Sequence, residues 1–167
     1  ESNGEKPEPV AICRLKRVAA DNKDDIRPRL PKAPKKKNGK RIALIGAGPA
    51  SLTVARDLAP LGYSVDIYDN QFAGGGMMRS QIPSFRLPVA VLDEEVNYIL
   101  GMGVTTTFNT QVDSLKEILN KQYDAVFVGT GAPRGKGLNL PGLEDAIANV
   151  YLGIEWLSSV AFEHTTS

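Results

Sequence analysis

Residues 41–52 read RIALIGAGPASL, and this stretch decides the fold. Its first five residues form a short apolar run of the kind found in buried parallel strands. A glycine turn follows, after which residues 49–61 place apolar side chains at helical spacing and residues 63–69 show the pattern of a second strand. The stretch therefore predicts a strand–turn–helix–strand unit with a right-handed crossover, the start of an α/β fold with a central parallel sheet.

The turn Gly46-x-Gly48-x-x-Ser51 has the form of a dinucleotide-binding fingerprint. Gly46 permits the sharp turn, Gly48 lets the backbone approach a pyrophosphate, and the start of the next helix offers free N–H groups to the phosphates. Ser51 stands where a third glycine is usual and is small enough to be tolerated there. A fortuitous glycine turn is the alternative interpretation.

Asp69 ends the predicted second strand, where an acid accepts hydrogen bonds from the adenosine ribose hydroxyls. The same carboxylate would repel a 2′-phosphate, and neither Asn70 nor Gln71 supplies a positive charge. The residues themselves thus predict FAD or NAD as the ligand, and not NADP.

The rest of the chain continues the α/β pattern. We expect helices over residues 9–21, 88–100, 113–121 and 151–162, strands over 104–108 and 123–129, and loops over 72–87 and most of 131–149. Asp93, Glu94 and Glu95 are expected in the first turn of the helix that Pro88 opens, where acids favour the helix dipole.

A basic segment precedes this domain. Its eight basic side chains, with no acid among them, are Arg27, Arg29, Lys32, Lys35, Lys36, Lys37, Lys40 and Arg41. Prolines interrupt the run, so it is predicted to be an extended, solvated linker. The alternative is a docking strip for an acidic partner; nucleic acid is disfavoured because no aromatic residue is present to stack on bases.

Cysteine and histidine are too scarce for a disulfide framework or a metal site. Cys13 is the one cysteine and is expected to be an ordinary thiol, which fits a reducing, cytoplasmic setting. His164 is the one histidine and is expected in a surface tail. No apolar stretch is long enough to span a membrane, and no residue is predicted to be catalytic.

Five stretches together show a resemblance to a known family. They are residues 9–17 (PVAICRLKR), 46–52 (GAGPASL), 75–79 (GGMMR), 82–88 (IPSFRLP) and 123–131 (YDAVFVGTG). In these stretches the chain resembles the flavoprotein module of the bacterial glutamate synthase small subunit, related NAD(P)H oxidoreductases and the FAD domain of dihydropyrimidine dehydrogenase. The resemblance divides the chain into residues 1–38, a helix and basic linker, and 39–167, the first half of an FAD-binding Rossmann-type domain.

The resemblance implies FAD as the ligand and NAD(P)H as its reductant. It implies that the cofactor contacts Gly46, Gly48, Pro49, Ala50, Ser51, Leu52, Asp69, Asn70, Gly75, Gly76, Met77, Arg79, Arg86, Val112, Thr130 and Gly131. Two of these assignments have structural alternatives. Residues 129–131 could be an ordinary turn at the end of a strand, and the methionines at 77 and 78 could fill a gap in the core instead of packing on the flavin.

The departures from the family concern what this chain lacks. A lone cysteine cannot hold an iron–sulfur cluster, and no second glycine fingerprint follows residue 131. We therefore expect 4Fe-4S clusters and the NAD(P)H site in other parts of a longer polypeptide or in an electron-transfer partner, so that this segment alone is inactive. The alternatives are an NAD-binding Rossmann module and a non-catalytic piece that mediates interaction in a larger assembly.

Overall fold

The computed structural model describes residues 9–162, which divide at Pro31 into two compact units. The first unit holds α1 (Ile12–Asp21) and a single 3-10 turn, η1 (Arg27–Arg29). The helix begins three residues later than the sequence pattern suggested, and Ala11 is its N-cap. Within these residues, no helix has the length and apolar character needed to cross a bilayer.

The second unit is built on four short parallel strands. These are β1 (Arg41–Ile45), β2 (Ser64–Tyr68), β3 (Thr105–Thr107) and β4 (Ala125–Val128). They lie in the order β3-β2-β1-β4, so that β1 pairs with both β2 and β4. The predicted α/β fold with a central parallel sheet is confirmed, because all three strand pairs are parallel.

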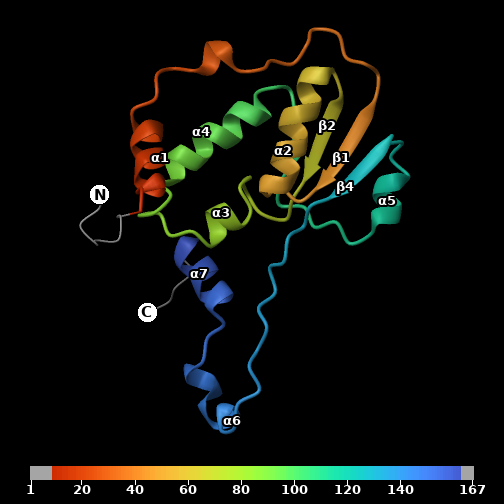
Figure 1. The fold of residues 1–167 in the computed structure, drawn as a ribbon. Helices are drawn as coiled ribbons and strands as arrows, with labels where there is room; N and C mark the ends of the chain where they lie inside the picture. Colours follow the sequence, from red (N-terminus) through yellow and green to blue (C-terminus); the bar gives the residue numbers. More distant parts are fainter. Residues whose placement is uncertain (1–8, 163–167) are drawn as a thin grey trace, which may run out of the picture. The chain divides into compact units, whose positions relative to one another are not determined.

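Helices cover the two faces of this sheet (Figure 1). Helices α2 (Pro49–Leu58), continued by the 3-10 turn η2 (Ala59–Leu61), and α4 (Val89–Leu100) pack on one face, and α5 (Leu115–Leu119) packs on the other. Successive residues of the strands point alternately into the apolar cores on the two faces of the sheet. Ile42, Leu44, Val65 and Ile67 join the α2 and α4 core, whereas Ala43 and Ile45 face Ile118 of α5.

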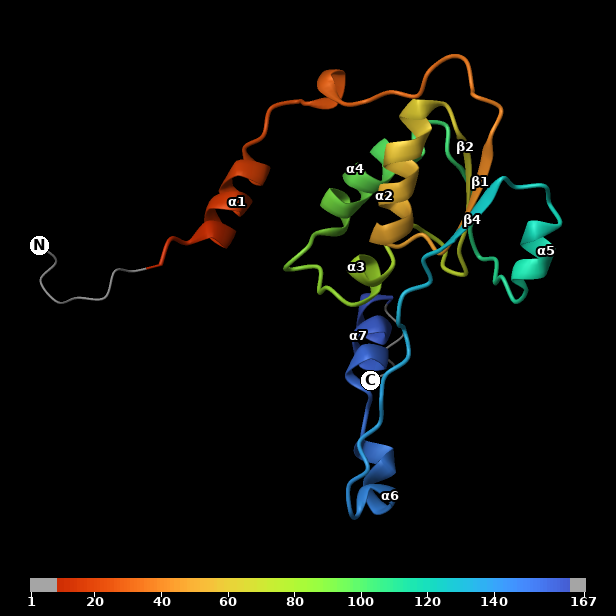
Figure 2. The ribbon, with the colours of Figure 1, turned by 45° about the vertical axis from the view of Figure 1, so that its right-hand side comes forward.

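Three short helices complete the unit. They are α3 (Met77–Ser80), α6 (Leu143–Ala146), which is followed by the 3-10 turn η3 (Ile147–Asn149), and α7 (Gly153–Ala161). Residues 132–152 run outward from the end of β4 and return to α7, which lies against α3 (Figure 2). Gln81 Nε2 donates to the Ile154 carbonyl at 3.0 Å, and the rings of Phe72 and Phe162 meet edge to face at 5.6 Å.

The expectation for the acids of α4 is wrong. The helix begins at Val89 with Pro88 as its N-cap, so its first turn contains no acid and Asp93 lies in the second turn. There the Asp93 carboxylate pairs with the guanidinium of Arg79 in α3, and the Arg79 side chain is only 9% exposed. The position of this carboxylate is thus explained by a tertiary ion pair and not by the helix dipole.

The basic segment begins in the first unit and ends in the second. From Lys32 onward the chain belongs to the second unit, and the Asn38 N–H donates to the Gly62 carbonyl at 2.9 Å. Lys40 Nζ pairs with the Asp124 carboxylate at 2.7 Å. These contacts explain why the compact division falls at Pro31, ahead of the boundary that the sequence suggested at residue 38.

Candidate functional site: a dinucleotide pocket

Three glycine segments, distant in sequence, meet at the carboxyl edge of the sheet. Gly46 has φ +95°, and a Cβ added to it would lie 2.5 Å from the Gly129 carbonyl oxygen. Gly76 has φ +54°, and its added Cβ would lie 2.7 Å from Gly48 Cα. The Gly75 N–H donates to the Ala47 carbonyl at 2.9 Å. Only glycine allows these backbones to approach so closely, so the three turns form one cradle.

The start of α2 opens into this cradle. Gly48 is the N-cap, and no side chain caps the helix. Because Pro49 has no N–H, the first free donors of the helix are the backbone N–H groups of Ala50 and Ser51. Free donors and the positive end of the helix dipole attract an anion such as a pyrophosphate.

Asp69 fixes the loop beside the cradle. One carboxylate oxygen accepts the Ala47 N–H and the other accepts the Gln71 N–H at 2.7 Å. An ionised carboxylate has about four acceptor positions, so two remain for ligand hydroxyls. The Asn70 amide also donates to the Gln111 side chain at 2.9 Å, which joins this loop to the one after β3.

A pocket of about 740 Å³ extends from this cradle along the edge of the sheet, a volume in the range of cofactor sites. Residues expected from the sequence to contact a cofactor line much of it: Gly46, Gly48, Pro49, Ala50, Asp69, Asn70, Gly76, Met77, Val112, Thr130 and Gly131. These residues come from five segments of the chain, and the fold brings them together around one continuous space.

Five of the expected contacts lie outside the pocket lining. Ser51 and Leu52 face the core beneath α2, and Gly75 is buried behind the cradle. Arg79 donates to the Gly74 carbonyl and pairs with Asp93. Arg86 is exposed in the turn before α4. Cofactor contact by the side chains of these residues stays a prediction; Ser51 can still offer its backbone N–H.

The structure also adds pocket residues that the sequence did not indicate. The group consists of Ile45, Tyr68, Ser80, Gln81, Thr110, Gln111, Ala132, Pro133, Ile154, Glu155, Ser158 and Ser159. Many of them are neighbours of predicted residues. Those of α7 gave no local signal, because only the return of residues 132–152 brings that helix to the pocket.

The described residues contain no group of three or more His, Cys, Asp or Glu side chains that could hold a metal ion. Cys13 is exposed, and His164 lies outside the described residues. The site offers backbone donors for phosphates, a carboxylate for hydroxyls and an extended pocket wall.

Known proteins are similar to this chain in sequence and in fold. Residues 44–115 match the family of NAD(P)-binding Rossmann-like domains. The chain is 38% identical over 151 residues to subunit PreT of the NAD-dependent dihydropyrimidine dehydrogenase of Salmonella typhimurium, over 89% of this chain and 36% of the relative. It is 28% identical over 151 residues to the NADPH glutamate synthase small chain of Bacillus subtilis, over 89% of this chain and 30% of the relative.

Among solved structures, a mutant of FprA from Mycobacterium tuberculosis matches with a TM-score of 0.52 and 26% sequence identity, over 63% of this chain and 25% of that one. The chain spans about a third of the length of PreT and of the glutamate synthase small chain, at 36% and 30% respectively. These similarities confirm the resemblance that the five sequence stretches predicted. The chain is similar in sequence to these oxidoreductase subunits, and its second unit has a Rossmann-like fold.

Proposed function

We propose that the pocket binds FAD and that the chain is the FAD-binding segment of an NAD(P)H-dependent flavin oxidoreductase. The observation that carries the proposal is the contact between the three glycine segments around the open start of α2. Gly48 and Gly76 leave a cradle that a Cβ would fill, and the Ala50 and Ser51 N–H groups would hold the pyrophosphate there.

The two ends of the pocket suit the two ends of the cofactor. Asp69 and the loop of residues 110–112 would hold the adenosine half, since the carboxylate keeps free acceptor positions for ribose hydroxyls. Met77 and the polar side chains of α3 and α7 would line the path of the flavin half. FAD supplies the redox chemistry when it is bound, and the protein binds and orients it.

In the whole protein, electrons would pass between NAD(P)H, FAD and iron–sulfur centres or a partner. The relatives named as an NAD-dependent dehydrogenase subunit and an NADPH glutamate synthase chain support the NAD(P)H part of this role. No second glycine fingerprint follows residue 131, so NAD(P)H would bind to a region or partner other than this chain. An NAD-binding module is the second candidate, because the matching family is described as NAD(P)-binding.

Titration of the purified chain with FAD and, separately, with NAD tests the proposal. We expect FAD to bind, with a shift of its visible absorption band and quenching of its fluorescence. Binding of NAD without FAD would favour the second candidate, and binding of neither by a folded chain would overturn both.

A Gly48→Ala variant places the binding at the cradle. Gly48 has φ −76°, and its added Cβ would meet nothing closer than Gly76 Cα at 3.9 Å, so the variant should fold. The methyl group would occupy cradle space, and we expect FAD affinity to fall about tenfold, or ~1.4 kcal/mol. Gly137→Ala is the matched control, because an added Cβ meets nothing within 4 Å there and the residue lies outside the pocket.

A further inference from the structure

Tyr68 lies in the pocket wall and was not expected there from the sequence. It is the last residue of β2, directly before Asp69, and lies in register with Ile45 of β1. Ile45, Tyr68 and Val112 all line the pocket, and they pack in the same apolar cluster on the α5 face of the sheet. The end of the pocket beside Asp69 therefore has an apolar wall with one aromatic ring.

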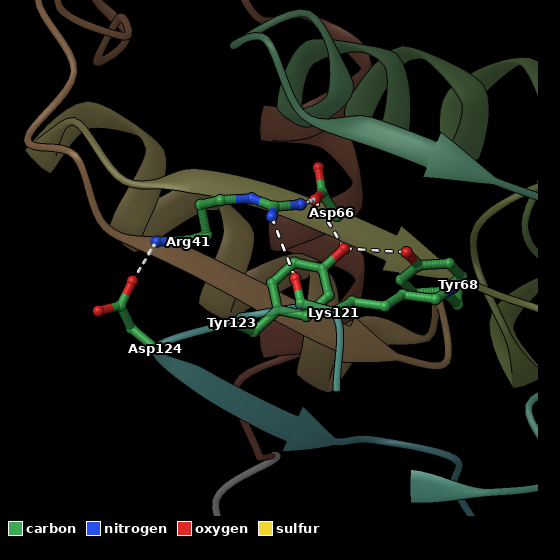
Figure 3. A network of polar contacts seen from close by, with 6 residues as sticks. All are labelled: Arg41, Asp66, Tyr68, Lys121, Tyr123 and Asp124. Carbon is green, nitrogen blue, oxygen red and sulfur yellow. Dashed lines mark hydrogen bonds and ion pairs between the residues drawn. The ribbon is translucent and has the colours of Figure 1, made fainter. Parts of the chain in front are cut away.

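A directional chain of hydrogen bonds fixes the hydroxyl end of this ring (Figure 3). The Tyr123 hydroxyl donates to an Asp66 carboxylate oxygen at 2.8 Å, and the Tyr68 and Tyr123 hydroxyl oxygens are 2.9 Å apart. Because each hydroxyl has one proton and that of Tyr123 is used on Asp66, Tyr68 donates to Tyr123. The same Asp66 oxygen pairs with the Arg41 guanidinium at 3.0 Å, which anchors the chain on an ion pair.

A cationic side chain lies over the aromatic ring of each of the two tyrosines, Tyr68 and Tyr123. The Lys121 ammonium lies 4.8 Å from the centre of the Tyr68 ring, and the Arg41 guanidinium lies 4.5 Å from that of Tyr123. Arg41 also donates to the Lys121 carbonyl at 3.2 Å, which closes the network. Burial and the hydrogen bonds to Tyr68 and Asp66 raise the pKa of the Tyr123 phenol above its usual value, so this hydroxyl keeps the proton that it donates to Asp66.

We propose that Tyr68 binds the adenine base of the dinucleotide and that the Arg41–Asp66–Tyr123 network orients its ring before the ligand arrives. The proposal rests on the proposed function, in which Asp69 binds the adenosine ribose. A base attached to that ribose would reach the neighbouring wall, where a planar aromatic ring and two aliphatic side chains suit the face of a purine. An aromatic ring already fixed in place loses little conformational entropy on binding.

The probe for this inference is ADP, the part that FAD and NAD share. We expect Tyr68→Leu to weaken ADP binding about tenfold, a typical effect of losing one aromatic contact with a base. Tyr68→Phe keeps the ring and loses only the hydrogen bond, so its loss should be about twofold to threefold. Tyr123→Phe should resemble Tyr68→Phe, although Tyr123 does not line the pocket. Tyr151→Leu is the matched control, because that side chain is 73% exposed and outside the pocket.

Nuclear Overhauser contacts between the adenine protons of bound ADP and the Tyr68 ring provide a test that needs no substitution. Their presence supports the inference, and their absence while ADP binds overturns it, as does a folded Tyr68→Leu variant that binds ADP like the wild type. If the wild type binds NAD but not FAD, the identity of the cofactor is wrong and the role of Tyr68 stands. If it binds FAD but not ADP, the role of Tyr68 fails and the proposed function stands; if it binds none of FAD, NAD and ADP, both proposals fail.

Discussion

The hydroxyl of Ser51 offers a test of how the fingerprint packs. Ser51 has no exposed surface, and its Oγ has no hydrogen-bond partner among the described residues. A Cβ added to Gly129 would lie 2.4 Å from this Oγ and 2.8 Å from Cε1 of the Phe127 ring. The serine at the third fingerprint position therefore fills the space between α2 and the end of β4, and its hydroxyl is buried at a cost.

The cost can be estimated from these contacts. A buried hydroxyl without a partner costs about 1–3 kcal/mol, so Ser51→Ala should raise the free energy of unfolding by about 1 kcal/mol. In a chain of this size that corresponds to an increase of about 2–4 °C in Tm. Gly129→Ala should lower the free energy of unfolding by about 2 kcal/mol through overpacking. If the two effects were independent, the double variant would be less stable than the wild type by about 1 kcal/mol. We expect it to be about 1 kcal/mol more stable than that, because the Ser51 oxygen that the new methyl group would meet is gone.

Urea unfolding of the four proteins, followed by circular dichroism, measures all of these differences. Destabilisation by Ser51→Ala would show that the hydroxyl makes a favourable contact. Equal effects of Gly129→Ala in the two backgrounds would show that Ser51 and Gly129 are not packed against each other. The first result would refute the unpaired state of the Ser51 hydroxyl, and the second would refute the close approach of α2 to the end of β4.

Two further predictions concern the cradle and the surface. Gly76→Ala should destabilise the fold by about 3 kcal/mol, since φ +54° is strained for alanine and its Cβ would lie 2.7 Å from Gly48 Cα. Gly142→Ala is the control: φ is +79° there and nothing lies within 4 Å of an added Cβ, so it should cost only about 1 kcal/mol. Equal losses of stability in urea unfolding would refute the clash at Gly76. The Lys40 ammonium holds the pKa of the Asp124 carboxyl below its usual value. The ion pair therefore stabilises the fold fully at pH values above the unfolded-state pKa of about 4. This stabilisation is lost as the pH falls through the lower pKa of the folded state. The stability difference between the wild type and Asp124→Asn should therefore shrink when unfolding is measured at falling pH, and a constant difference would contradict it.

Local patterns predicted the parallel sheet well, because β1 and β4 are short apolar runs that are each followed by a glycine turn. The strand at residues 41–45 was predicted with its observed bounds. The helix expected over residues 49–61 is α-helical only to Leu58, and Pro60 lies in the 3-10 turn that follows. A proline removes the backbone donor that a further α-helical turn would use, so this difference also has a local cause.

Tertiary contacts account for what the sequence could not predict. The guanidinium of Arg79 donates to the Gly74 carbonyl and pairs with Asp93, and the pairing with Asp93 could not be predicted from the sequence. Nothing within a few residues of Arg79 indicates that partner, because the pair forms only when α3 packs on α4. Tyr68 and the residues of α7 were missed for the same reason: their place in the pocket depends on strand register and on the path of residues 132–152.

Amide chemical shifts of the isotope-labelled chain, recorded during titration with FAD, test the central claim most directly. We predict the largest changes at the N–H groups of the open helix start, Ala50 and Ser51, and at Thr130 and Gly131 across the cradle. A second group of changes should appear at residues 69–71 and 110–112, where the adenosine half would lie. Saturating FAD that leaves these amides unmoved, while NAD moves them, would contradict the account.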